Sequence, residues 1–360
     1  MSGSDPDPAV EFDAATRLDP GDFPFAHGAP LGTAMLKRTP EDFQVGEDLG
    51  YLPSGEGGHA WLWVRKRDAN TEWVAKRLAE FAGVAPVSVG YAGLKDRKAL
   101  TSQWFSIDLL GRAEPDWGAF EAPGVEILEI RRNPRKLRRG ALAGNAFTIT
   151  LHGVEASATR LDQRCTRIVT RGVPAYFGPQ RFGRGGGNLA RARELLIEGR
   201  RVRDRHRRGL YLSAARAWLF NRILARRIAD RSWDRPLVGD LMMLDGSHSL
   251  FRLDVLDERI EQRGAELDIH PSGTLWGRGS DDLSGRPAAI EGEALEGLGG
   301  WQTGLEAAGL RRARRALRTP VRGLAWEHRS NGRVTLSFGL PAGAYATVVL
   351  RELLALRDGG

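Results

Sequence analysis

Segments with the pattern of β-strands lie near both ends of this chain, and the region between them has a different character. Short apolar or alternating runs occur before residue 155 and again after residue 323. From about residue 170 to residue 320 the chain is rich in glycine and arginine, with helical or irregular patterns. We therefore expect one sheet that the chain leaves near residue 170 and rejoins near residue 320.

The individual elements follow from hydrophobic periodicity and from turn signals. Asn70 or Thr71 can cap a helix over residues 70–83, and Gly83 suits the left-handed position at its end. Asn331 and Gly332 supply the tight turn of a hairpin over residues 323–340. The remaining expected strands are residues 59–67, 87–91, 102–109, 124–132 and 145–154, and the remaining expected helices are residues 188–198, 213–229, 305–318 and 344–356.

Length and composition limit the classes of protein that fit. The 360 residues are enough for two domains at about 150 residues each, and 41% of them are apolar. The single cysteine, Cys165, excludes an intramolecular disulfide and a multi-cysteine metal site, and favours a buried small side chain. No run approaches 18 apolar residues and the N-terminus has no signal-peptide pattern, so we expect a cytoplasmic protein with no membrane partner.

Positive charge points toward an anionic partner, nucleic acid first. Lysine and arginine number 53 against 45 acidic residues, for a net charge of +8. Three basic runs, at residues 131–139, 200–208 and 311–318, are dominated by arginine. A single such run is usually a solvated face, whereas three arginine-rich runs favour phosphate recognition. The glycine-rich segment 183–188 is either a flexible turn before a helix or a backbone cradle for a phosphate.

The loop "AGLKDRKALTSQWFSI", residues 92–107, holds one carboxylate among three cations between two expected strands. On its own, the Lys-Asp-Arg sequence is an ordinary charged turn. Its functional interpretation is a nucleophilic Asp96, because a carboxylate can attack or stabilise an electron-poor sugar carbon without a metal. Neighbouring Lys95, Arg97 and Lys98 would favour the ionised carboxylate and bind phosphates.

At this loop the sequence resembles the TruD family of tRNA pseudouridine synthases, which isomerise uridine 13 of tRNA. The resemblance is carried by "AGLKDRKALTSQ" together with five further blocks in the same order and spacing, so that it covers residues 34–355. These blocks are "LKRTPEDFQVGEDLG" (36–50), "RKLRRGALAGNAFTI" (135–149), "GVPAYFGPQRFG" (172–183), "LSAARAWLFN" (212–221) and "LPAGAYATVVLREL" (340–353).

The resemblance implies an α+β fold with two domains. The catalytic domain is a pseudouridine-synthase domain with a mixed, largely antiparallel sheet, and the second is an inserted α/β (TRUD) domain. Residues 31–171 and 319–360 would form the catalytic domain, residues 172–318 the inserted domain, and residues 1–30 a flexible N-terminal arm.

The resemblance also implies roles for individual residues. Asp96 is the expected nucleophile, and Lys37 is expected to pair with it. Phe43, Asn145, Phe147 and Tyr345 are expected to contact the target nucleotide; relatives often have Phe where this chain has Tyr345. The expected contacts to the RNA backbone are Lys95, Arg97, Lys98, Arg135, Lys136, Arg138 and Arg139.

The expected reaction breaks the N-glycosidic bond of uridine, turns the base and joins C5 to the ribose. It involves no net redox change or hydrolysis, so we expect no cofactor and no metal. Asp96 would attack C1′ or assist elimination to a glycal, and addition at C6 of uracil is the competing route. We expect tRNA as partner, no obligate protein partner and a monomer. The alternative function is a non-catalytic tRNA-binding or folding factor, whose basic runs are its whole function.

Overall fold

The computed structural model describes residues 23–109, 111–280 and 282–359, and these divide into two compact units. We call residues 30–165, 321–346 and 353–359 the sheet unit, and residues 23–29, 166–320 and 347–352 the middle unit. Residues 1–22 of the expected flexible arm lie outside the described residues. The described remainder of that arm is packed, because Phe23 is buried and stacks on Tyr176 within the middle unit.

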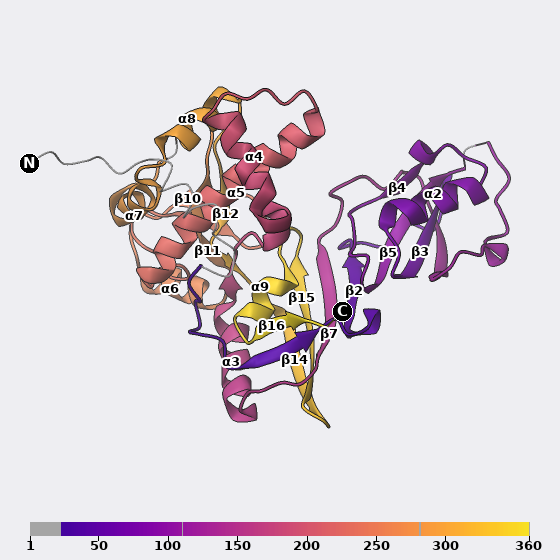
Figure 1. Ribbon diagram of the computed structural model, residues 1–360, viewed down its shortest axis with the longest axis horizontal. Helices are drawn as coiled ribbons and strands as arrows, with labels where there is room; N and C mark the ends of the chain where they lie inside the picture. Colours follow the sequence, from indigo (N-terminus) through magenta and orange to yellow (C-terminus); the bar gives the residue numbers. More distant parts are fainter. Residues whose placement is uncertain (1–22, 110, 281, 360) are drawn as a thin grey trace, which may run out of the picture. The chain divides into compact units, whose positions relative to one another are not determined.

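The sheet unit is built on an eight-stranded sheet (Figure 1). The strand order is β14-β15-β7-β2-β5-β3-β6, and β4 pairs with β5. All pairs are antiparallel except β2 with β5. The expected mixed, largely antiparallel sheet of an α+β fold is confirmed. The strands are β2 (Phe43–Asp48), β3 (His59–Arg67), β4 (Val89–Tyr91), β5 (Leu100–Asp108), β6 (Val125–Asn133), β7 (Gly144–Leu151), β14 (Arg322–Arg329) and β15 (Arg333–Pro341).

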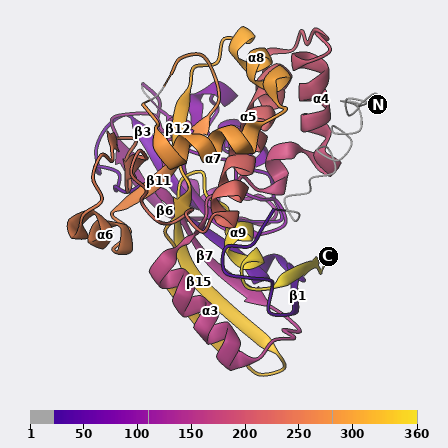
Figure 2. The same cartoon turned by 90° about the vertical axis from the view of Figure 1, so that its left-hand side faces the viewer.

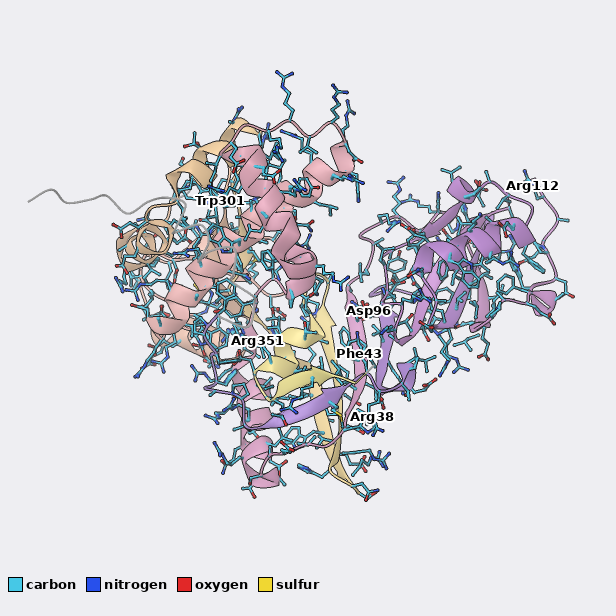
Figure 3. The ribbon with its side chains drawn as sticks, viewed as in Figure 1. Arg38, Phe43, Asp96, Arg112, Trp301 and Arg351 are labelled. Atoms are coloured by element: carbon cyan, nitrogen blue, oxygen red, sulfur yellow. The ribbon has the colours of Figure 1, made fainter. Side chains whose placement is uncertain are left out.

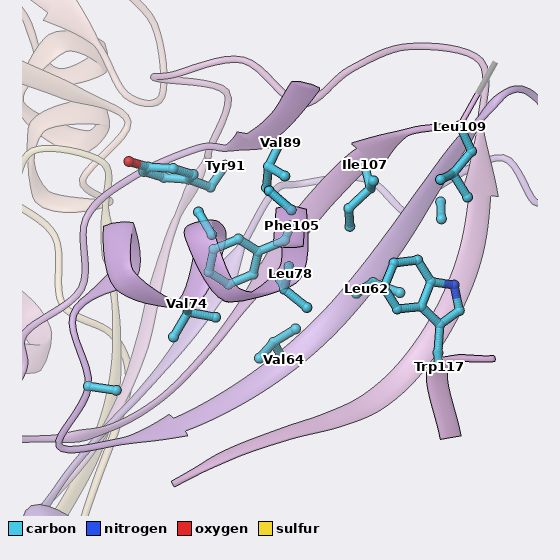
Figure 4. Close-up of a cluster of buried hydrophobic side chains, with 14 residues drawn as sticks. Leu62, Val64, Val74, Leu78, Val89, Tyr91, Phe105, Ile107, Leu109 and Trp117 are labelled. Carbon is cyan, nitrogen blue, oxygen red and sulfur yellow. The ribbon is translucent and has the colours of Figure 1, made fainter. Parts of the chain in front are cut away.

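Helix α2 (Thr71–Phe81) covers one face of this sheet. Its apolar side, with Val74 and Leu78 fully buried, packs on Leu62, Val64 and other strand residues (Figure 4). The alternation of β3 places Leu62, Val64 and Lys66 on this same face, because side chains two apart in a strand point the same way. The helix end follows the expected signal, since Gly83 has a left-handed backbone with φ of 62°.

The C-terminal hairpin joins the sheet beside β7, about 180 residues later in the chain, as the interrupted pattern predicted. Strand β15 pairs with β7, and its turn at Asn331 and Gly332 has φ of 60° and 62°. Helix α3 (Ala158–Arg171) runs along the hairpin (Figure 2), and Asp162 accepts hydrogen bonds from the side chains of Trp326 and His328.

The expected helix over residues 344–356 is wrong in its extent. Helix α9 covers only Ala346–Arg351, and the chain then enters β16 (Ala355–Asp358), which pairs in parallel with β1 (Thr33–Leu36). Leu353 and Leu354 between them are fully buried. Burial of two successive apolar residues and pairing with β1 outweigh the helical periodicity here.

The middle unit combines a four-stranded antiparallel sheet with several helices. Its long helix α5 (Arg205–Ala229) lies against α4, α7 and β11 (Figure 1). Sheet order is β10-β9-β11-β12, and a separate pair joins β13 and β8. The elements are β8 (Val173–Pro174), α4 (Gly187–Leu196), β9 (Leu241–Leu244), β10 (Leu250–Arg252), α6 (Glu258–Ala265), β11 (Ile269–Leu275), α7 (Gly285–Leu295), α8 (Gly299–Ala307), β12 (Ala313–Ala316) and β13 (Arg318–Thr319).

The expected basic helix over residues 305–318 is also wrong. Helix α8 ends at Ala307, Gly309 takes a left-handed backbone, and the following residues form β12 and β13. Arg314 is buried and bonds to Ser272, Thr274 and Glu291, while Arg318 is buried and donates to three backbone carbonyls. Two of the run's five arginines, Arg314 and Arg318, therefore belong to the interior of the middle unit.

Within the described ranges, no helix has the length and apolar content needed to cross a membrane.

Candidate active site

Asp96 lies on the loop between β4 and β5, with its carboxylate directed outward. The side chain is 60% exposed, and its Oδ2 accepts a hydrogen bond from Lys37 Nζ at 3.0 Å. Figure 3 shows Asp96 and Phe43 near each other in the sheet unit. The pairing expected between Asp96 and Lys37 is therefore present in the structure.

Lys37 occupies a special position at the end of β1. Its φ of 58° is in the left-handed region, which a lysine adopts only when the surrounding structure requires it. Its Nζ lies 4.2 Å from the centroid of the Phe43 ring, a cation–π contact. One ammonium group thus touches both the Asp96 carboxylate and the Phe43 ring.

Three phenylalanines from neighbouring strands form an apolar floor beside this ion pair. Phe43 on β2 meets Phe147 on β7 edge-on at 6.1 Å, and Phe147 stacks on Phe338 of β15 at 5.4 Å. All three are buried. Strand pairing fixes the set, since Phe147 lies opposite both Val45 and Phe338.

Lys66 supports the Asp96 loop from inside the protein. Its side chain is fully buried on β3, and its Nζ donates to the carbonyl oxygens of Ala69 at 2.7 Å, Asp96 at 2.8 Å and Lys95 at 3.5 Å. Burial lowers the pKa of Lys66 to about 8, although the Asp96 carboxylate acts in the opposite direction.

A second buried pair fixes the residue before Asp96. Lys95 Nζ donates to Glu47 Oε1 at 2.7 Å, with 5% and 0% of the two side chains exposed. Burial raises the pKa of Glu47, and the charge of Lys95 opposes that shift. Glu47 also accepts from the backbone N–H of Trp104, which ties the loop to β2 and β5.

This pairing concerns the expectation that Lys95 contacts the RNA backbone. The Lys95 side chain is 5% exposed and is held by a buried carboxylate, so it faces inward here, and its contact with RNA stays a prediction. Arg97 is exposed and ion-paired with Asp68 at 3.3 Å, and Lys98 is exposed. Only two of the loop's three cations therefore face solvent.

The basic run 131–139 is partly engaged by the sheet unit itself. Lys136 Nζ donates to the carbonyl oxygen of Val87, and Arg139 donates to Tyr91 while its guanidinium lies 3.9 Å from that ring's centroid. Arg135 and Arg138 are exposed. Of the four expected backbone contacts in this run, these last two are exposed and have no side-chain hydrogen bond or ion pair within the described parts of the chain.

Asn145 and Tyr345 lie at the joined ends of β7 and β15. Asn145 is opposite Glu47 on β2 and Leu340 on β15, and its Oδ1 is buried without a hydrogen-bond partner in the described parts of the chain. Tyr345 is half-buried, four residues beyond Pro341, which pairs with Gly144. The sheet register thus brings the chain segments of these residues to one end of β7.

Sequence reasoning missed Lys66 and Glu47, although each left a signal. Lys66 continues the buried alternation of Leu62 and Val64, and a lysine on the core side of a strand implies a specific buried partner. Glu47 alternates with Phe43 and Val45 in the segment Phe43–Asp48, which was not predicted to be a strand.

Two other expectations concern residues away from this loop. Cys165 is fully buried, and burial raises its pKa to about 12, so the expectation of an inert small side chain is confirmed. Among the described residues, no group of three or more His, Cys, Asp or Glu side chains forms a metal-binding cluster.

Comparison with known proteins identifies the family. The profile of the family described as tRNA pseudouridine synthase D (TruD) matches residues 25–201 and 200–353. A tRNA pseudouridine synthase D of Methylococcus capsulatus is 51% identical over 339 residues, covering 94% of this chain and 96% of the relative. The chain belongs to the tRNA pseudouridine synthase D family. A relative of that name from Pseudomonas aeruginosa is 50% identical over 341 residues, covering 94% and 95%.

The resemblance stated from the sequence motifs is therefore confirmed. A solved structure of the family agrees in fold: a Methanosarcina mazei protein provisionally assigned as tRNA pseudouridine synthase D superposes with a TM-score of 0.70. The superposition covers 99% of both chains at 21% sequence identity. The fold expected for the family is confirmed as well.

Proposed function

We propose that this protein isomerises uridine 13 of tRNA to pseudouridine, with Asp96 as the nucleophile and without a cofactor. Membership of the tRNA pseudouridine synthase D family supports the general activity, pseudouridine synthesis in tRNA. The main structural support for the role of Asp96 is its solvent-facing carboxylate, which is ion-paired with Lys37 on a loop anchored by buried groups.

The chemistry suits an exposed carboxylate on a fixed loop. Attack of Asp96 on C1′ of the ribose would break the bond to N1 of uracil and form an ester; elimination to a glycal is the other route. The freed base turns, and its C5 bonds to C1′ as the ester bond to Asp96 breaks and the carboxylate is restored. The C5 proton then leaves and N1 gains a proton, so atoms and electrons balance.

The surrounding residues would serve the detached base. Lys37 would hold the Asp96 carboxylate in place between cycles. Phe43 and Phe147 would provide a water-poor surface, which favours recombination over loss of the base. Asn145 Oδ1 would accept a hydrogen bond from uracil N3–H, since it is an acceptor without a partner in the described structure. Tyr345 would contact the target nucleotide from the segment after β15.

The test uses unmodified tRNA carrying tritium at C5 of uridine, because isomerisation releases that hydrogen. We expect tritium release from wild type, with pseudouridine mapped to position 13. Asp96→Asn should lower the single-turnover rate by at least about 10⁴-fold and leave tRNA binding within a few-fold. Asp254→Asn, which also neutralises an exposed ion-paired carboxylate, should keep the wild-type rate.

Each alternative predicts a different result in this assay. Appreciable pseudouridine formation by Asp96→Asn would refute the role of Asp96, and product at another position would refute uridine 13. Wild-type protein that binds tRNA but releases no tritium would favour the non-catalytic binding factor.

A further inference from the structure

Nine residues of the middle unit carry more than half of the chain's net charge. The segment 200–208, "RRVRDRHRR", has six arginines and one aspartate, so its charge is +5 of the chain's +8 with His206 neutral. It follows α4 and includes the first turn of α5 (Figure 1). We call it the arginine segment.

The other two basic runs are largely engaged by protein groups. In the run 311–318, Arg314 and Arg318 are buried, and Arg312 and Arg315 lie over the rings of Trp276 and Phe177. In the run 131–139, Arg131 and Arg132 pair with Glu129 and Glu114, whereas Arg135 and Arg138 are exposed. The arginine segment therefore has more exposed arginines than either of the other two runs.

Within the arginine segment, the side chains of four arginines make no ion pair, hydrogen bond or ring contact in the part of the chain that the structure describes: Arg201, Arg203, Arg205 and Arg208. The two remaining arginines are paired, Arg200 with Glu194 at 2.7 Å and Arg207 with Asp204 at 3.8 Å. Three of the four unpaired side chains belong to exposed residues, and Arg208 is half-buried.

The segment's only carboxylate does not neutralise these four arginines. Asp204 caps α5, accepting from the backbone N–H groups of His206 at 2.8 Å and Arg207 at 3.0 Å. These backbone hydrogen bonds lower the pKa of Asp204. Several like charges held close together without counter-ions repel one another, and that repulsion is relieved by a bound polyanion.

We propose that the arginine segment binds the phosphate backbone of tRNA; this rests on the proposed function. Guanidinium groups bind phosphates through two parallel hydrogen bonds, which favours arginine over lysine at such a surface. Val202, the segment's one large apolar residue, is half-buried, so the nine residues of the segment present no exposed apolar side chain to a membrane. Arg205 and Arg208 are one helical turn apart and lie about 5–6 Å from each other at Cβ.

The experiment replaces the four unpaired arginines by glutamine: Arg201→Gln, Arg203→Gln, Arg205→Gln and Arg208→Gln together. The matched control makes the same charge change at four exposed arginines that have carboxylate partners, Arg65, Arg77, Arg252 and Arg329. Affinity for unmodified tRNA is measured at several salt concentrations, and the single-turnover rate at saturating tRNA.

We expect the segment variant to bind tRNA at least about 30-fold more weakly, with the slope of log affinity against log salt reduced by about 3. The control should change affinity by less than about 3-fold. The rate at saturating tRNA should stay within 2-fold for both, since Asp96 is intact. Equal losses in both variants, or wild-type affinity in the segment variant, would overturn the proposal.

Two outcomes distinguish this proposal from failure of the proposed function and from binding to a membrane. If wild type forms no pseudouridine, the proposed function fails whatever the segment does. If the segment variant loses binding to vesicles of anionic phospholipid but keeps its tRNA affinity, the partner is a membrane and the proposal is wrong.

A second, independent observation concerns Lys66. Its ammonium group faces three carbonyl oxygens and needs all three of its N–H bonds to satisfy them. The charges around it are Asp96 and Asp68, which favour the cation, and Lys95, which disfavours it. No carboxylate oxygen hydrogen-bonds to it in the described structure, so its contacts are to the backbone alone.

We infer that Lys66 is a positioning residue for the proposed nucleophile. It holds the main chain of residues 95–96 against β3, so that the Asp96 carboxylate meets Lys37 at the surface. Loss of one proton leaves only two N–H donors for three carbonyls and removes the positive charge beneath Asp96. The low pKa that burial gives Lys66 places this loss within reach of ordinary assay conditions.

The test combines Lys66→Met and Lys66→Arg with a pH series. Lys66→Met should lower the single-turnover rate by at least about 100-fold with tRNA affinity within 3-fold. The wild-type rate should fall as pH rises through about 8, whereas Lys66→Met should show no such fall. If Lys66→Arg folds, its guanidinium group stays charged, so this variant should keep a constant single-turnover rate across that pH range.

If Lys66 only filled space in the core, these variants would give different results. Folded Lys66→Met with the wild-type rate would overturn the inference, as would an identical alkaline fall in wild type and Lys66→Met. If wild type forms no pseudouridine, the proposed function is refuted instead.

Discussion

Asp96 and the two lysines behind it differ sharply in exposure. The Asp96 side chain is 60% exposed, whereas 5% of Lys95 and none of Lys66 reach solvent. Buried cations are rare in proteins unless paired or hydrogen-bonded, and both lysines meet that condition. The loop thus has a fixed, charged interior and one exposed carboxylate at its surface, paired with Lys37.

The buried Lys66 gives a prediction for stability against pH. Its pKa falls from an ordinary 10.5 to about 8 in the folded state. Between these values the unfolded chain binds more protons than the folded one, so the contribution of Lys66 to folding stability rises with pH. Urea unfolding of wild type and Lys66→Met from pH 7.5 to 10 measures it. Above about pH 8, we expect the free energy of unfolding of wild type to increase relative to that of Lys66→Met. The catalytic rate of wild type is expected to fall over the same pH range.

At the scale of elements, β2 connects the sheet to the Asp96 loop through Glu47. Breaking a buried ion pair leaves an uncompensated charge, so Glu47→Gln should lower the free energy of unfolding by about 3–5 kcal/mol. The double variant Glu47→Leu with Lys95→Met should recover most of that loss, because neither charge remains. Denaturant unfolding compares both with Glu126→Gln, whose exposed pair with Arg65 should contribute less than about 1 kcal/mol.

A Glu47→Gln variant as stable as wild type would show that the loop does not depend on this pair. Recovery in the double variant is the more informative measurement, since it separates the pair from the packing of each side chain alone.

The strands with clear alternation were predictable, and those that carry charge inward were not. Strand β3 and the hairpin turn at Asn331 and Gly332 follow directly from local pattern. Strand β2 was missed because the inward-facing Glu47 obscures its periodicity. In the same way, the buried Arg314 made β12 look like part of an exposed basic helix. Local patterns record a residue's polarity, whereas its partner comes from a distant part of the chain.

The residues of the candidate site also divide into those that the sequence predicted and those that it did not. Asp96, Lys37, Phe43 and Phe147 were expected from the family resemblance. In the structure the Lys37 ammonium group contacts Asp96 and Phe43, and Phe147 packs against Phe43. Lys66 was not expected, because its role appears only when β3 and the loop are side by side.

At the scale of the whole molecule, the last residues of the chain contribute to both units. Val349 and Leu350 belong to the middle unit and Leu353 and Leu354 to the sheet unit, and all four are fully buried. In the middle unit, Glu352 accepts from the backbone N–H of His27 at 3.0 Å. A short tail thus helps to complete two separate cores.

Truncation tests this arrangement. Removal of residues 347–360 deletes several buried side chains, each contributing about 2–5 kcal/mol, from a native state whose total is about 5–15 kcal/mol. We expect no cooperative thermal unfolding and rapid proteolysis of both units. Removal of residues 355–360 alone deletes β16 and spares the buried side chains, so a transition at a lower temperature should remain. A chain ending at Ala346 that unfolds like wild type would contradict the expectation.

The late position of β15 has a consequence for synthesis on the ribosome. Strand β7 ends at Leu151, but the neighbour that carries Phe338 is translated only after residues 166–320 of the middle unit. Until residues 333–341 leave the exit tunnel, β7 has an unpaired edge and Phe147 lacks its stacking partner. The nascent protein therefore carries an unpaired, association-prone β7 edge while about 180 further residues are translated, and the apolar floor of the candidate catalytic centre is complete only once β15 has been made.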